Sequence, residues 1–303
     1  MSSPAASPAP EQQHARGRSF LDIVARLRAA GCVFAEDEAE LLVAEASTAE
    51  QLTHMVEQRV TGFPLEQVLG WAEFCGLRIA VDPGVFVPRR RTELLVREAA
   101  ALARKDAPNP AAPPALPAPS AYSTPPIPSD IPSPLIVVDL CCGSGAVGAA
   151  LAHTLGRIDL HAADIDPAAV ACARRNLAPT GGHVYNGDLY QPLPETRCGR
   201  INILIANAPY VPTEAIGLLP QEARVHEPRV ALDGGADGLD VLRRVTEAAP
   251  RWLAPGGSLL FEISESQAPG MVETVARHGL IPRIVECEDL DATIIVATAP
   301  SEP

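Results

Sequence analysis

The sequence contains no long hydrophobic run. None of its 303 residues falls in a stretch that approaches the ~18 consecutive apolar residues of a membrane-spanning helix. Residues 1–17 are rich in Pro, Ala and Ser and lack the apolar segment of a signal peptide. We therefore expect no membrane span, and we interpret residues 1–17 as a disordered tail.

Cysteine pairs at metal-binding or redox spacing are also missing. The seven cysteines are scattered along the chain and include no C-x-x-C pattern. Because their number is odd and no export signal precedes them, they indicate reduced thiols in a cytoplasm. We predict a cytoplasmic protein without a bound metal ion.

Positive charge is scarce. The chain has 24 Lys and Arg against 37 Asp and Glu, which gives a net charge of −13. Direct binding to nucleic acid is not expected, because it depends on a basic surface that neutralises phosphates. The run Arg89-Arg90-Arg91 is a local exception, for which a solvated helix start is the favoured interpretation.

The pattern of apolar residues divides the chain into two parts that are expected to fold, and the first part is helical. Within residues 18–73, apolar residues recur at helical spacing from Phe20 to Leu27, and Thr48 with Gln51 forms a capping-box pattern. This predicts a small helical domain. Because it contains no evident catalytic residue, we interpret it as a substrate-recognition domain.

In residues 74–106 the apolar residues recur at a different spacing. Apolar residues alternate with other residues over 77–81, and the Asp-Pro-Gly sequence at 82–84 supplies turn residues before a second apolar run. We predict a β-hairpin whose turn lies at 82–84, followed by a connecting helix over 92–105.

The composition changes twice more. Residues 107–134 are dominated by proline, which predicts a semi-rigid, largely disordered linker. From 135 to 303, strand and helix patterns alternate, as in a doubly wound α/β fold with a mostly parallel sheet. Strands are predicted at Leu135–Leu140, Ile158–Asp164, His183–Asn186, Ile201–Asn207, Ser258–Ile263, Ile281–Val285 and Thr293–Ala297.

The first predicted strand of this half leads into a glycine turn. Gly143 and Gly145 allow a ligand to approach the backbone closely. With Gly148 they match the G-x-G-x-x-G pattern of dinucleotide sites, which is weak evidence by itself. Asp139 places a carboxylate beside the turn, so a pyrophosphate would be repelled and a cationic ligand favoured.

Two further acids follow strands. Asp164 ends the second strand, the position from which an acid binds ribose hydroxyls; the alternative role of helix N-cap suits Asp166 better, because it directly precedes Pro167. Asp188 follows the third strand, where it either accepts a hydrogen bond from an adenine amino group or belongs to a simple Gly-Asp turn. Together with the glycine turn, these acids indicate an adenosine-bearing cation, and S-adenosylmethionine fits better than NAD.

The apolar strand that begins at Ile201 ends abruptly in Asn207-Ala208-Pro209-Tyr210. Pro209 cannot continue a central strand because it has no N–H to donate. An amide side chain, two carbonyls and an aromatic ring are therefore left at the carboxyl end of a strand, where ligands bind in open α/β sheets. A plain Asn/Pro turn is the alternative interpretation.

In combination these motifs resemble a known family. The chain is similar to the class I S-adenosylmethionine-dependent methyltransferases and, within them, to the HemK/PrmC family, the protein glutamine-N5 methyltransferases of peptide chain release factors. The matching segments include Pro64-Leu65-Glu66-Gln67, Phe74-Cys75-Gly76-Leu77, Val87-Pro88-Arg89, Thr92-Glu93, the loop 139–145, Gly187-Asp188-Leu189, Asn207-Ala208-Pro209-Tyr210 and Glu227-Pro228. The chain departs from the family at Ala208, where the family has Pro, at Cys141, where Gly is usual, and at Arg90-Arg91, where Pro-Glu is common.

The resemblance implies a Rossmann-like, seven-stranded, mostly parallel sheet, S-adenosylmethionine as cofactor, and a monomer acting on a class 1 release factor. It implies that the Asn207 side-chain oxygen and the Ala208 carbonyl accept the two hydrogens of a glutamine amide, with Pro209 beside them and Tyr210 packed on the amide plane. The implied cofactor-binding residues are Asp139, Cys141, Gly143, Gly145, Asp164, Asp188 and Asn207. The implied substrate-binding residues are Arg89, Glu93, Glu227 and Pro228, although the last two are also compatible with a surface turn.

Two other functions remain open from the sequence. An N6-adenine or other nucleic-acid amino-methyltransferase uses a similar Asn/Tyr site, although the acidic balance and the short helical domain disfavour it. A catalytically weakened S-adenosylmethionine-binding partner protein is suggested by Ala208.

Overall fold

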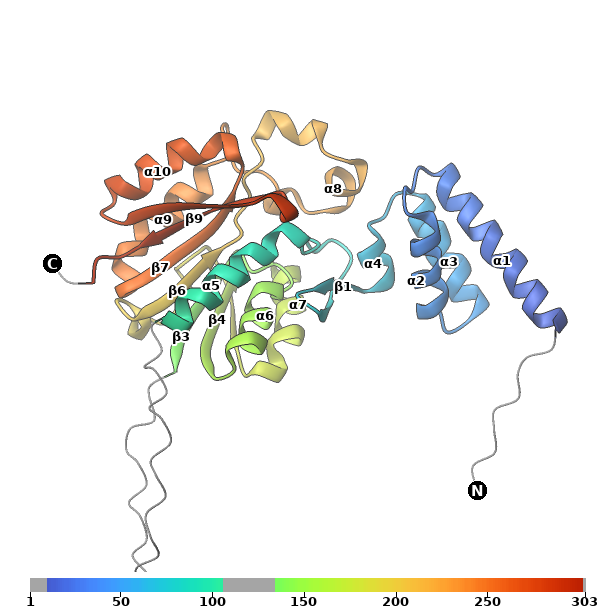
Figure 1. Ribbon diagram of the computed structural model, residues 1–303, viewed down its shortest axis with the longest axis horizontal. Coiled ribbons are helices and arrows are strands. Elements are labelled where there is room, and N and C mark those ends of the chain that lie inside the picture. The colour runs from blue at the N-terminus through green and yellow to red at the C-terminus, as the bar shows by residue number, and fades with distance from the viewer. Residues whose placement is uncertain (1–9, 106–133, 302–303) are drawn as a thin grey trace, which may run out of the picture.

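A computed structural model describes residues 10–105 and 134–301, which form a small helical part and a larger α/β part (Figure 1). Of the predicted linker, only Pro134 is therefore described. The helical part packs around buried side chains such as Leu27, Leu42 and Val56, in keeping with the helical spacing of the sequence. Its helices are α1 Pro10–Ala29, α2 Ala35–Glu45, α3 Ala49–Val60 and α4 Leu65–Leu69.

Helix α1 begins earlier than the sequence suggested. It starts at Pro10, inside the segment interpreted from the sequence as a disordered tail. Proline suits a first helical turn, since its φ is already helical and its missing N–H would be unpaired there, and the Glu and Gln residues that follow favour a helix. Residues 1–9 lie outside the described residues.

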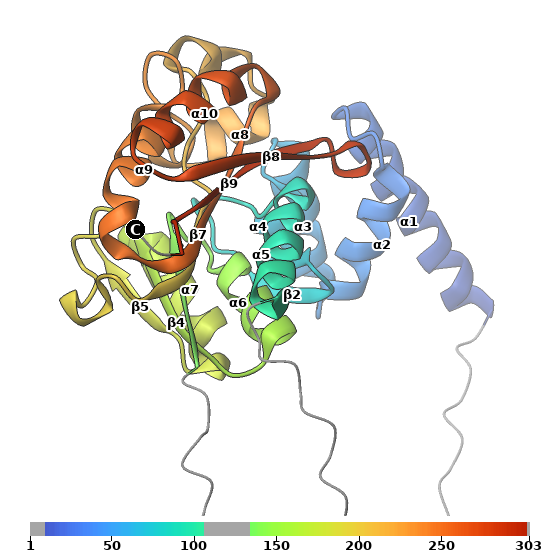
Figure 2. The ribbon, with the colours of Figure 1, turned by 60° about the vertical axis from the view of Figure 1, so that its left-hand side comes forward.

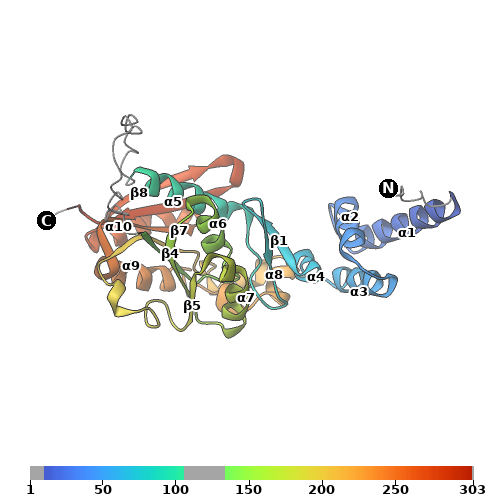
Figure 3. The same cartoon turned by 90° about the horizontal axis from the view of Figure 1, so that it is seen from below.

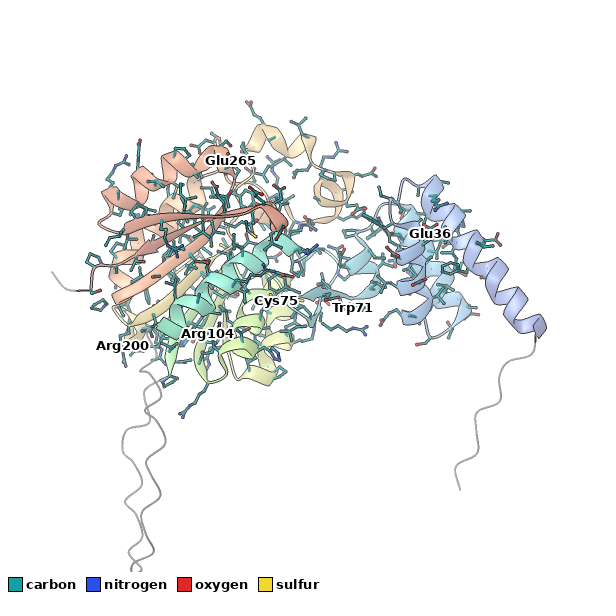
Figure 4. The ribbon with its side chains drawn as sticks, viewed as in Figure 1. Glu36, Trp71, Cys75, Arg104, Arg200 and Glu265 are labelled. Atoms are coloured by element: carbon teal, nitrogen blue, oxygen red, sulfur yellow. The ribbon has the colours of Figure 1, made fainter. Side chains whose placement is uncertain are left out.

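The β-hairpin is present but its predicted turn is wrong. Strands β1 Trp71–Phe74 and β2 Leu77–Ala80 pair antiparallel, so the turn is Cys75-Gly76 and not 82–84. Both turn residues have positive φ, 51° and 74°, as a two-residue hairpin turn requires, and Cys75 gives no sequence signal for that conformation. Trp71 and Cys75 lie where the helical part joins the α/β part (Figure 4).

The α/β part contains the predicted seven-stranded sheet, in the order β5-β4-β3-β6-β7-β9-β8. Strand β9 runs in the direction opposite to the other six strands of this sheet, because a short connection through Asp291, at φ 47°, turns the chain back from β8. The strands are β3 Leu135–Leu140, β4 Ile158–Asp164, β5 His183–Asn186, β6 Ile201–Ala206, β7 Leu253–Ile263, β8 Ile281–Cys287 and β9 Ala292–Thr298.

Helices cover both faces of this sheet (Figures 2 and 3). The α5, α6 and α7 side buries Val137 and Ile205, whereas the α9 and α10 side buries Val138 and Leu204. Neighbouring residues of one strand thus enter opposite cores, which explains why the central strands are apolar runs. The helices are α5 Glu93–Lys105, α6 Ala146–Leu155, α7 Pro167–Leu177, α9 Asp240–Trp252 and α10 Ala268–Arg277.

One segment was not predicted at all. Between β6 and α9 the structure contains a 3₁₀ turn, Thr213–Leu218, and the short helix α8 Gln221–His226. In Figure 1 this segment projects from the α/β part toward the helical part.

Across 10–105 and 134–301, no helix is both long and apolar enough to cross a membrane.

Candidate active site

The site lies at the topological switch point of the sheet, where the order of the strands reverses. Strands β3 and β6 are neighbours, paired at Leu140 and Ala206, but the chain continues from β3 to β4 on one side and from β6 to β7 on the other. This divergence opens a crevice at the carboxyl ends of the two strands. The glycine turn after β3 and the Asn207 segment after β6 meet there, as the sequence predicts.

A first cavity, of about 750 Å³ including some open solvent, occupies this crevice. Three of its lining residues are carboxylates: Asp139, Asp164 and Asp166. Among the described residues that line it there is no Lys, Arg or His. A pyrophosphate would find no positive partner in this cavity, so its chemistry favours a cationic ligand.

The glycine turn shapes one wall of the first cavity. Cys141 and Gly143 both have φ 54° and both line the cavity; for Cys141 this is a conformation that favours glycine. Gly145, at φ 78°, does not line it. A Cβ on Gly145 would lie 3.2 Å from the Ala173 Cβ, so this glycine allows α7 to pack closely.

Two of the carboxylates are held by backbone N–H groups. Asp139 is 1% exposed and its Oδ2 accepts a hydrogen bond from the Gly148 N–H at 3.0 Å; burial raises the Asp139 pKa to about 7. Asp164 accepts from the Gly143 N–H at 2.8 Å and from the Asp166 N–H at 2.9 Å, and burial raises its pKa as well. Each Asp164 oxygen therefore retains a lone pair for ribose hydroxyls.

A second cavity, of about 830 Å³ including open solvent, adjoins the first. Four residues line both: Phe86, Asn207, Pro209 and Ala231. Ala208 and Tyr210 line the second cavity only, so the Asn207 segment separates the two spaces. A group in one cavity can meet a group in the other only beside these residues.

The second cavity is also lined by an ion pair between a buried carboxylate and a partly exposed guanidinium. Glu227 is 5% exposed, and its Oε1 accepts hydrogen bonds from Arg89 Nη2 at 2.6 Å and from the Val87 N–H at 3.2 Å. Burial raises the pKa of Glu227. The surface-turn alternative for Glu227 is thus wrong, and Pro228 lines the first cavity.

Two residues of the site, Glu262 and Thr92, were given no role from the sequence. Glu262, at the end of β7, is 2% exposed; its Oε1 accepts from the Tyr210 hydroxyl and its Oε2 from the Thr92 hydroxyl, both at 2.7 Å. Asn207 Nδ2 in turn donates to Thr92 Oγ1 at 3.4 Å. The signal available was a carboxylate inside the apolar run Leu259–Ile263.

Besides Gly145, two further predicted site residues lie outside both cavities. Asp188 forms an ion pair with Arg244 and lines a separate, more open pocket rather than either cavity. Glu93 pairs with Arg97 on the surface of α5, outside both cavities. Their roles in binding stay predictions.

Comparison with known proteins decides the family. Residues 130–233 match the family described as Methyltransferase small domain. A release factor glutamine methyltransferase of Geobacter sulfurreducens is 36% identical over 227 residues, which cover 74% of this chain and 69% of the relative.

The chain belongs to the release factor glutamine methyltransferase family.

A second relative is named for a different substrate. The 4-amino-L-phenylalanine/4-methylamino-L-phenylalanine methyltransferase of Streptomyces pristinaespiralis is 32% identical and covers 78% of this chain and 74% of the relative. Among solved structures, the hMettl16 catalytic domain aligns with a TM-score of 0.52 at 12% identity, covering 84% of this chain and 82% of that one. This last similarity shows the shared fold alone. The predicted class I methyltransferase fold is confirmed.

Proposed function

We propose that this family member transfers a methyl group from S-adenosylmethionine to the side-chain amide nitrogen of a glutamine in a peptide chain release factor. The observation that carries the proposal is the position of Asn207, which lines both the first and the second cavity. The first cavity suits a cationic nucleoside. The amide side chain of Asn207 lies between this cavity and the second one, where the acceptor would bind.

The chain's own residues fit the cofactor. Asp164 offers free lone pairs for ribose hydroxyls, Gly143 leaves the backbone open to close approach, and Asp139 supplies negative charge. When bound, S-adenosylmethionine supplies an electrophilic methyl group on a positively charged sulfur. The three carboxylates of this cavity complement that charge.

The acceptor amide needs help because its nitrogen lone pair is delocalised. We assign Asn207 Oδ1 and the Ala208 carbonyl to accept its two hydrogens; within residues 10–105 and 134–301, no group donates to either oxygen. These bonds hold the nitrogen in place and stabilise the positive charge that develops when it is methylated. The nitrogen then loses one proton to water. Ala208 contributes through its backbone, so the missing proline ring leaves the acceptor intact.

The helical part serves protein recognition in this proposal. It contacts the segment over the second cavity, through Arg59 with Glu222 and through the rings of Phe63 and His226, whose centroids are 4.0 Å apart. A release factor on the helical part would therefore lie beside the second cavity. Because one chain lines both cavities, we propose a monomeric enzyme.

Labelled S-adenosylmethionine and a purified class 1 release factor test this function. We expect label on one glutamine, located by peptide mass spectrometry, and none with Asn207→Ala. Parallel reactions contain 4-amino-L-phenylalanine, DNA or RNA instead. Label only in one of these, with the release factor unlabelled, would overturn the proposal.

A further inference from the structure

The carboxamide of Asn207 has two ends of opposite hydrogen-bonding character. Its Oδ1 accepts hydrogen bonds and its Nδ2 donates them, and the two atoms are nearly alike in size. Only the oxygen can accept a hydrogen of an acceptor amide. If the group were rotated by half a turn, two N–H donors would face each other and the acceptor amide would lose the hydrogen bond that positions its nitrogen.

Thr92 decides this rotation. Its hydroxyl has one proton, and that proton goes to Glu262 Oε2 at 2.7 Å, because a carboxylate accepts and does not donate. Toward Asn207, at 3.4 Å, Thr92 Oγ1 can then only accept. The Nδ2 end of Asn207 must therefore face Thr92, which leaves Oδ1 directed away from it.

Glu262 is the fixed end of this chain of hydrogen bonds. Each of its two oxygens receives a hydroxyl proton, one from Thr92 and one from Tyr210, and Arg91 Nε lies 3.7 Å away as a positive neighbour. Both carboxylate oxygens therefore have a hydroxyl donor, and a guanidinium lies nearby. With only 2% of Glu262 exposed, water does not compete for these bonds.

We propose that Thr92 and Glu262 are positioning residues that fix which atom of Asn207 faces the acceptor. Through its second oxygen Glu262 also holds the Tyr210 hydroxyl, so one buried carboxylate orients both polar side chains of the Asn207 segment. This inference rests on the proposed function and deepens it. Thr92 precedes α5 and Glu262 ends β7, so the orientation is set by the tertiary fold.

Substitutions at Thr92 separate polarity from packing. Thr92→Val keeps the shape but removes the acceptor for Asn207 Nδ2, whereas Thr92→Ser keeps the hydroxyl. We expect the single-turnover methylation rate of Thr92→Val to fall about tenfold or more, with Thr92→Ser within about threefold of the natural protein. The cofactor dissociation constant should change little in both, whereas Thr92→Val should also lower the melting temperature because Glu262 Oε2 loses its buried donor.

Glu262→Gln tests the other end. An amide cannot accept from both Thr92 and Tyr210 through two oxygens, so its NH₂ group must donate to one of them. Where it donates to Thr92, the Thr92 proton turns to Asn207 and favours the reversed carboxamide. We expect a fall in kcat of about tenfold or more, with KM and cofactor affinity within about twofold.

The chain offers a matched control for Thr92→Val. Thr246 on α9 is fully buried, and its Oγ1 has no hydrogen-bond partner among the described residues. Thr246→Val should therefore leave the methylation rate unchanged. If Thr92→Val and Thr246→Val methylate equally fast, the inference is wrong, while label on the release factor in the natural protein would still support the proposed function. No label with the natural protein contradicts the function itself.

Discussion

Arg59 of α3 lies 2.7 Å from Glu222 of α8, so the helical part holds the segment that covers the second cavity. The same guanidinium makes a bidentate pair with Glu38, at 2.6 and 3.0 Å, inside the helical part. One buried Arg thus links the core of the helical part to the wall of the acceptor site.

Removing the Glu222 charge should weaken this link without unfolding the helical part. In Glu222→Gln we expect KM for the release factor to rise about two- to fivefold, since a partly exposed pair contributes modestly, while cofactor affinity stays unchanged. Glu36→Gln, which breaks the surface pair with Arg28, is the matched control. Steady-state kinetics with equal KM in both variants would show that Glu222 does not position the cavity wall.

Arg59→Ala should act on stability instead. The substitution leaves the Glu38 carboxylate, 11% exposed at its side chain, buried without its cation. Breaking a buried pair in this way costs about 3–5 kcal/mol. Denaturant unfolding followed by circular dichroism measures the loss, and a change below about 1 kcal/mol would contradict it.

Cofactor affinity should depend on pH through Asp139. Its pKa is raised to about 7, so the carboxylate is mostly protonated at pH 6 and mostly ionised at pH 8. A sulfonium ligand should therefore bind up to about tenfold more tightly at pH 8, measured by calorimetry. Asp139→Asn should lose most of this dependence; a slope as steep as that of the natural protein would exclude Asp139 as its source.

The raised pKa of Asp139 also makes the free energy of unfolding depend on pH. This free energy falls as pH rises, whereas cofactor affinity increases. Between the unfolded value of about 4 and the folded value of about 7, the native state binds more protons than the unfolded state. The Asp139 contribution to the free energy of unfolding therefore falls as pH rises through this window and is constant above it. Thermal unfolding of the natural protein and of Asp139→Asn measures that difference.

Asp164 and Asp188 make a direct comparison, because only Asp164 lines the first cavity. Asp164→Ala should lose a charge-assisted pair to ribose hydroxyls, about 1.5–3 kcal/mol of cofactor affinity. Asp188→Ala, which frees Arg244, should change affinity less than threefold. Equal losses in calorimetry would instead support the adenine contact that the sequence suggested for Asp188.

The sheet and its switch point were predictable because their signals are local. The apolar run at 201–206 and the glycine turn at 143–145 each show their structure within a few residues. The hairpin turn was misplaced because positive φ at Cys75 has no sequence signal. The Thr92–Glu262 bond joins segments 170 residues apart, so no local pattern reveals it.

The roles of Asn207 and Ala208 can be separated by substitution. Asn207→Ala deletes an acceptor needed most in the transition state, so the single-turnover rate should fall about a hundredfold or more. Ala208→Pro keeps the carbonyl, and in the described structure the Ala208 N–H donates no hydrogen bond that proline would remove. Proline also fixes φ and reduces conformational freedom. We therefore expect Ala208→Pro to be equally active or up to about threefold faster.

Methylation rates and cofactor dissociation constants, measured on the same preparations, decide whether Asn207 acts on the acceptor amide or on the cofactor. Cofactor affinity should change little in either variant if Asn207 acts on the acceptor, although Asn207 borders both cavities. A tenfold loss of cofactor affinity in Asn207→Ala would move its main role to the first cavity. If Asn207→Ala methylates the release factor at the natural rate, the acceptor role of Asn207 is wrong, because no other amide side chain lines the second cavity within the described residues.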